Sequence, residues 1–234
     1  MNRFAVVALA LLPVLGVVPA WGQAPAAKEG LPERVAALKK SLAQSQGALR
    51  NYQWVETTSV TLKGEVKSQK QMSCHYGADG ALQKLPISST PPPKKKGGLW
   101  GKIAESKKEE LTDTMKHAVA LVKTYVPPNP AMIQRAVDAG KVSIEILQPG
   151  KVARLVFKDY ELPGDSLGVT MDLTTNHLMA ISVASYLGAP SKPVTMNATM
   201  GSLADGTTYT ASTQLSLPSD QLVVNVANSD YRKM

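Results

Sequence analysis

The C-terminal part of the sequence, from Lys141 onward, consists of short segments in which apolar and polar residues alternate. Turn sequences such as Pro149-Gly150 and Asp205-Gly206 separate these segments at intervals of roughly ten residues. The segments that fit this pattern are residues 142–148, 151–160, 166–173, 177–187, 194–201, 207–217 and 221–230. Consecutive strands of this length, joined by short turns, predict an antiparallel sheet.

The two faces of this sheet differ in composition, because successive side chains of a strand point to opposite sides. One face collects aliphatic residues and methionine, whereas residues such as Thr170, Thr195 and Asn197 occupy the other. Such a sheet buries one side and exposes the other to water. The apolar positions that we expect to line a ligand cavity are Trp54, Val60, Met72, Val169, Met171, Met179, Ile181, Val183, Met196 and Met200.

Methionine is unusually frequent, with nine residues against two phenylalanines. Flexible thioethers suit a surface that accepts varied apolar shapes, but they also fill ordinary cores. The alternation of apolar residues is the same for a lined cavity and for a filled core. Both interpretations therefore stay open at the level of sequence.

The N-terminal half adds helices and three more strands. Apolar residues recur at helical spacing over residues 31–49 and again from Leu111 to Tyr125. Asn129 and Gly140 bound a third helix over residues 130–139, and strands are expected at 52–62, 65–76 and 81–87. The sequence predicts an α+β fold: a curved, mostly antiparallel half-barrel sheet with about three helices packed on its concave apolar face. We assign it to a single domain over residues 31–231.

The N-terminus has the pattern of an export signal. A short basic start ending at Arg3 precedes an uncharged apolar run over residues 4–20, and small residues follow at the cleavage positions. We expect residues 1–22 to be a cleaved signal peptide and residues 23–30 to be a flexible N-terminus. The mature protein is then periplasmic or secreted, and soluble. Cys74 is the only cysteine, so no internal disulfide forms.

The sequence gives little support for catalysis. Gly164-Asp165-Ser166-Leu167 matches a serine esterase motif, but an Asp-x-x-His sequence, which those enzymes need, is absent. Cys74 and His75 are adjacent, so they point to opposite faces of a strand and do not share a metal ion easily. Glycine-rich phosphate loops are also absent. We expect no enzyme activity, no metal and no cofactor, with an esterase using Ser166 as a distant alternative.

A Pro/Lys/Gly-rich segment over residues 88–102 is expected to form a long surface loop. It places Lys94, Lys95, Lys96, Leu99 and Trp100 close together, a combination that suits an anionic membrane surface or an envelope protein partner. The alternative is a solvated loop whose tryptophan folds back onto the sheet. The net charge of +8, with only 19% charged residues, is too dilute for a dedicated nucleic-acid binder, so we expect no nucleic-acid partner.

The order of these elements resembles the periplasmic lipoprotein carriers, the LolA-like half-barrel superfamily. The resemblance in layout covers most of residues 31–231, beginning with a helix and the aromatic strand start at Tyr52 and Trp54. In residues it is carried by the strand, Asp-Gly turn and strand over 196–211 and by the closing strand over 222–231. The resemblance implies a half-barrel that holds a lipid or a lipoprotein acyl chain.

Together these features predict a non-enzymatic envelope protein that binds a hydrophobic small molecule or acyl chain, as a carrier or a sensor. The alternative is a periplasmic or secreted protein-interaction module with a filled core and no ligand. Solvent-filled volume between the sheet and the helices would favour the first function, and a tightly packed layer would favour the second.

Overall fold

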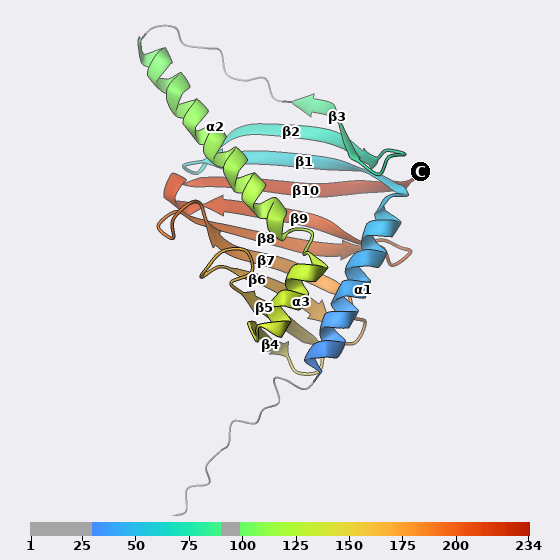
Figure 1. Ribbon diagram of the computed structural model, residues 1–234. Helices are drawn as coiled ribbons and strands as arrows, with labels where there is room; N and C mark the ends of the chain where they lie inside the picture. The colour runs from blue at the N-terminus through green and yellow to red at the C-terminus, as the bar shows by residue number, and fades with distance from the viewer. Residues whose placement is uncertain (1–29, 90–98) are drawn as a thin grey trace, which may run out of the picture.

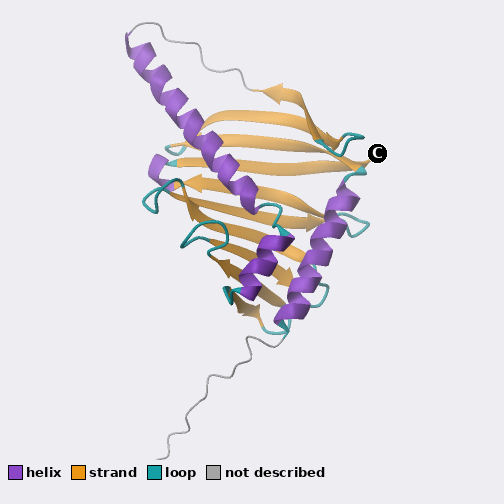
Figure 2. Ribbon diagram, in the orientation of Figure 1, coloured by secondary structure: helices purple, strands orange, loops and turns teal. Residues whose placement is uncertain are grey.

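The computed structural model describes residues 30–89 and 99–234 (Figures 1 and 2). The helices of this part are α1 (Leu31–Leu49), α2 (Leu99–Tyr125) and α3 (Pro130–Asp138). Its strands are β1 (Tyr52–Leu62), β2 (Glu65–Tyr76), β3 (Leu82–Ser89), β4 (Val142–Gln148), β5 (Val152–Lys158), β6 (Ser166–Asp172), β7 (Leu178–Tyr186), β8 (Pro193–Ser202), β9 (Thr208–Leu217) and β10 (Leu222–Lys233). The expected signal peptide lies outside the described residues.

All of these strands belong to one antiparallel sheet, in the order β3-β2-β1-β10-β9-β8-β7-β6-β5-β4. The sheet consists of two runs of consecutive strands, β1–β3 and β4–β10. The first strand pairs with the last one, with Val60 opposite Val224 and Leu62 opposite Leu222. This long-range pairing places β3 and β4, which are neighbours in the order of strands along the chain, at opposite edges of the sheet.

The helices cover one face because the chain must travel from one edge of the sheet to the other. Between β3 and β4 it forms α2 and α3, which cross the sheet on the same side as α1 (Figure 1). At 1.5 Å per residue, the 27 residues of α2 span roughly 40 Å. The result is an open, curved sheet with helices on one face, which confirms the α+β half-barrel that the sequence predicts.

Local sequence accounts for the turns and the helix ends. The β1–β2 hairpin turns at Lys63 and Gly64, whose φ angles of 52° and 80° are both positive, as a two-residue hairpin turn of the I′ kind requires. At the start of α3, the side chain of Asn129 accepts a hydrogen bond from the Ala131 N–H at 2.8 Å. Pro130 follows as the first helical residue, where its missing N–H costs nothing.

The segment 88–102 differs from the predicted loop at both ends. β3 continues to Ser89 because its backbone pairs with β2 as far as Lys70. At the other end, α2 begins at Leu99 and includes Gly101, a residue that costs a helix only about 1 kcal/mol. Residues 90–98, which include Lys94, Lys95 and Lys96, lie outside the described residues.

Candidate functional site

The inner apolar residues of β5–β9 form a filled core beneath the helices. They pack with Val35, Leu38 and Leu42 of α1, with Ile133 and Ala136 of α3, and with Ala118 and Tyr125 of α2. We call this part of the helix-covered face the closed half. Five of the predicted cavity residues lie there with 0–4% of their surface exposed: Val169, Met171, Ile181, Val183 and Met196. These five side chains are core residues in contact with protein, as the filled-core alternative expects.

Met179, a sixth candidate, lies outside the core with 41% of its surface exposed. The cause is a bulge between β6 and β7, where the register shifts so that Met171 pairs with Leu178. Leu178 then takes the inner position, with 6% exposure, and Met179 becomes the extra residue. The strict alternation that placed Met179 inside is therefore wrong at this point.

The remaining part of the helix-covered face is less completely buried. Val60 and Leu62 of β1, Met72 of β2 and Val226 of β10 are partly buried, as are Leu111 and Met115 of α2. We call this set the open half. All of them except Met72 pack against the rim of the core, as does the candidate Met200. Apolar side chains here keep contact with solvent, unlike those of the closed half.

Aromatic rings cover one end of the open half. The Trp54 ring stacks on Tyr231, with centroids 5.5 Å apart and an interplanar angle of 12°, and lies 5.8 Å from Tyr76. The ring of Tyr209 also packs against that of Tyr231, with centroids 4.3 Å apart. Burial raises the pKa of the Tyr231 hydroxyl, and it also raises the pKa of the fully buried Cys74 thiol. The sequence identified Trp54 but not its partners, because the β1–β10 pairing that brings them together is long-range.

A buried carboxylate holds the C-terminal end of α2 above the closed half. Asp165, 3% exposed, accepts hydrogen bonds from the backbone N–H groups of Tyr160 at 2.6 Å and Leu162 at 2.7 Å. Tyr125, the last residue of α2, donates its hydroxyl to the same carboxylate and also contacts the Ser185 hydroxyl at 2.8 Å. Burial and the bond to Asp165 raise the pKa of Tyr125.

This cluster gives the Gly164-Asp165-Ser166 sequence a structural role. Asp165 orders the turn before β6, and Ser166 is the first residue of that strand, between Lys158 and Ala184. Within residues 30–89 and 99–234, no histidine is hydrogen-bonded to Ser166. The sequence shows this aspartate directly after Pro163-Gly164, but the burial of its carboxylate depends on Tyr125, forty residues earlier in the chain.

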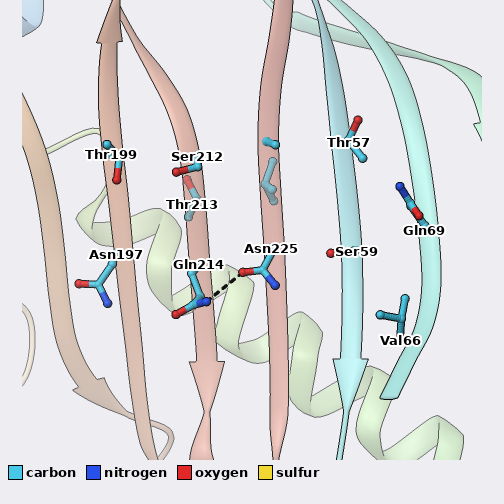
Figure 3. Close-up of a pocket in the computed structure, with 12 residues that line it drawn as sticks. Thr57, Ser59, Val66, Gln69, Asn197, Thr199, Ser212, Thr213, Gln214 and Asn225 are labelled. Carbon is cyan, nitrogen blue, oxygen red and sulfur yellow. Dashed lines mark hydrogen bonds between the residues drawn. The ribbon is translucent and has the colours of Figure 1, made fainter. Parts of the chain in front are cut away.

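Three hollows of the described part lie away from the closed half. The largest, of about 530 Å³, lies on the face of the sheet opposite the helices (Figure 3). Two others, of about 210 Å³ each, lie between α1 and the β8–β9 turn and beside the irregular pairing of β1 with β10. Trp54 is the one predicted cavity residue that contributes to any of these three.

The predicted surface contact is only partly described. Leu99 and Trp100 lie in the first turn of α2 rather than in a loop. In the described ranges, no group of three or more His, Cys, Asp or Glu side chains is arranged to hold a metal ion. No helix among the described residues combines the length and apolarity needed to cross a membrane.

Solved structures of low similarity include two bacterial proteins. No protein-family model and no curated protein matches the chain. A DUF1329 family protein from Desulfovibrio piger has 9% sequence identity and a TM-score of 0.42, over 86% of this chain and 92% of that chain. A LolA superfamily protein from Nitrosomonas europaea has 11% identity and a TM-score of 0.32, over 83% of this chain and 93% of that chain. The second of these proteins carries the name of the superfamily that the sequence resembles in layout.

Proposed function

We propose that this chain is a non-enzymatic, exported protein that binds an acyl chain or a similar apolar ligand against the open half, as a carrier or a sensor. The observation that carries the proposal is the difference in burial across the helix-covered face. Val169, Leu167 and Phe157 are fully buried in the closed half, whereas Val60 and Val226 keep solvent contact. A ligand that removed this apolar surface from water would gain about 25 cal/mol per Å².

The helix above the open half can adapt to a ligand. Tyr125 fixes the C-terminal end of α2, and Ala118 is fully buried, but Leu111 and Met115 nearer its N-terminus are only partly buried. A helix held at one end can change its distance from the sheet at the other end with little loss of core contact. Met72 and Met115 add flexible side chains that adjust to an apolar ligand.

A positive charge lies on the same face of the sheet. Lys70 pairs with Thr58 across β1 and β2, so its side chain shares the face of Val60 and Met72. In the described part of the chain, Lys70 has no ion-pair partner. It is therefore available for the carboxylate or phosphate of an anionic lipid.

Mass spectrometry of the protein purified from an envelope extract tests the proposal directly. We expect a stoichiometric lipid or acyl species that solvent extraction releases. Titration with a fluorescent fatty acid then compares Val60→Asn with Val66→Asn, a matched change on the opposite face of the same hairpin, where Val66 is 65% exposed. Val60→Asn should weaken binding at least tenfold and Val66→Asn should leave it unchanged.

The headgroup contact has its own test. Lys70→Gln should weaken binding of palmitate several-fold and leave binding of hexadecanol unchanged, because only the carboxylate interacts with the ammonium group. An equal loss of affinity for palmitate and hexadecanol would contradict a role for the Lys70 charge in binding. A clean apo mass with no uptake of fatty acid or phospholipid would contradict ligand binding as a whole.

The filled closed half favours one second candidate, a protein-interaction module of the envelope. Five of the residues predicted to line a cavity belong to the packed core. In this alternative the protein binds no ligand, and the open half serves as the surface on which another protein docks. Capture of one envelope protein by the wild type but not by Val60→Asn, together with a clean apo mass, would support this candidate over the carrier.

A further inference from the structure

The face of the sheet without helices carries a hollow of about 530 Å³, which we call the polar groove (Figure 3). One row of side chains crosses it: Asn197 of β8, Gln214 of β9, Asn225 of β10, Ser59 of β1 and Gln69 of β2. The sheet register pairs each of these residues with the next. The row therefore extends across five neighbouring strands, a length of roughly 19 Å at the usual spacing between strands.

A second row lies beside the first and supplies hydroxyl groups. Thr199 pairs with Ser212, and Thr57 lies across β10 from it, opposite Ala227. Within the first row, the Gln214 amide donates to the Asn225 carbonyl oxygen at 3.1 Å. The side-chain amides of Asn197 and Gln69 make no hydrogen bond to any other described residue. The groove thus presents donors and acceptors that are free to bind a ligand.

The groove has no charge. Charged residues make up 19% of the chain and its net charge is +8, yet none of the twelve residues that line the groove is charged. Elsewhere the sheet carries ion pairs, such as Arg154 of β5 with Glu145 of β4 at 3.5 Å. A neutral lining offers nothing to phosphates, nucleic acids or acidic peptides, whose binding depends on cations. It also lacks the Trp, Tyr and Arg anchors that dominate protein interfaces.

We propose that the polar groove binds a neutral glycan chain, extended across the strands along the row from Asn197 to Gln69. Amide and hydroxyl side chains both donate and accept, which complements the hydroxyl groups of sugars. The row is longer than one sugar ring, so a chain fits it better than a monosaccharide. The site is on the opposite face from the open half and does not depend on the apolar ligand proposed above.

The test is an NMR titration of the full chain with glucose and with three neutral hexasaccharides: maltohexaose, cellohexaose and the fully N-acetylated chitin hexamer. We expect at least one hexasaccharide to shift the side-chain amide signals of Asn197, Gln214 and Asn225 saturably. Glucose should bind at least tenfold more weakly. The double variant Gln214→Ala/Asn225→Ala should lose at least tenfold in affinity, whereas Gln148→Ala, an exposed strand glutamine at the β4 edge, should bind like the wild type.

Three results would overturn the proposal. One is the absence of saturable shifts at these amides with all three neutral hexasaccharides. Another is an equal response to hexagalacturonate, an anionic chain of the same length, because the neutral lining would then not discriminate between neutral and anionic chains. The third is unchanged affinity in the double variant. Fatty-acid binding measured on the same double variant keeps the two sites separate, since failure of the groove leaves the open half unaffected.

Discussion

The closed and open halves of the helix-covered face carry the same alternating pattern of apolar residues but differ in what covers them. Three helices fill the space above β5–β9, where Leu167 and Val169 are fully buried. Of the helices in the described part of the chain, α2 alone crosses above β1 and β10 (Figure 1), and Val60 and Val226 stay partly exposed. The difference shows that burial of an apolar strand face depends on where the connections of the chain pass, and not on the strand sequence.

The first prediction compares one polar substitution in the two halves. Met171→Asn should lower the free energy of unfolding by about 4 kcal/mol, because it removes a buried side chain and buries an amide without partners. Val60→Asn should lower it by only about 1 kcal/mol, since water already reaches that site. Urea unfolding of both variants measures the difference. Equal losses would mean that the open half is as tightly packed as the closed half.

The position of α2 provides a second, smaller effect. Asp165→Ala should lower the free energy of unfolding by about 3 kcal/mol, because three backbone N–H groups and the Tyr125 hydroxyl lose a buried acceptor. Amide hydrogen exchange should show the largest loss of protection in the last turns of α2 and in the 160–164 turn.

The matched control for this change is Asp172→Ala. Asp172 also accepts backbone hydrogen bonds in a turn, from Thr174 at 2.7 Å and Thr175 at 3.1 Å, but it is only partly buried. It should destabilise the protein less and leave α2 unchanged. Loss of protection in α2 in the Asp172 variant, or none in the Asp165 variant, would contradict the role of Asp165 in holding this helix.

The sequence predicts most of this fold because its signals are local. The strands from residue 142 onward, α1 and α3 follow from alternation, helical spacing and the Asn129 cap. The inner positions of Val169, Ile181 and Met196 follow from the same alternation. The predicted inner position of Met179 is wrong, because a single bulge shifts the register and the alternation of residues does not reveal the bulge.

The candidate site could be predicted only in part, since its limits depend on long-range order. The pairing of β1 with β10 decides that β3 and β4 lie at opposite edges, and hence where α2 crosses. That crossing separates the filled from the partly exposed half. The burial of Asp165 and the stacking of Trp54 on Tyr231 likewise join residues far apart in the chain.

The smallest effect concerns a bond that joins the start of β1, beside the open half, to the β8–β9 turn of the closed half. Tyr52 donates its hydroxyl to Asp205 at 2.5 Å, and this bond with those of Thr207 lowers the pKa of the Asp205 carboxyl to about 2. Because the folded pKa lies below the unfolded value of about 3.9, the bond stabilises the fold fully above that pH. This stabilisation is lost as the pH falls toward 2.

Denaturant midpoints of the wild type and Asp205→Asn, measured at pH 6 and at pH 2.5, test this link. The wild type should be more stable than Asp205→Asn at pH 6. The difference between their denaturant midpoints should narrow at pH 2.5, because the wild-type carboxyl then approaches the neutral form that Asn imitates. Tyr52→Phe should narrow the gap in the same pH range, since the carboxyl loses its strongest donor. A difference in midpoint that stays constant with pH would show that Asp205 acts only through the geometry of its turn.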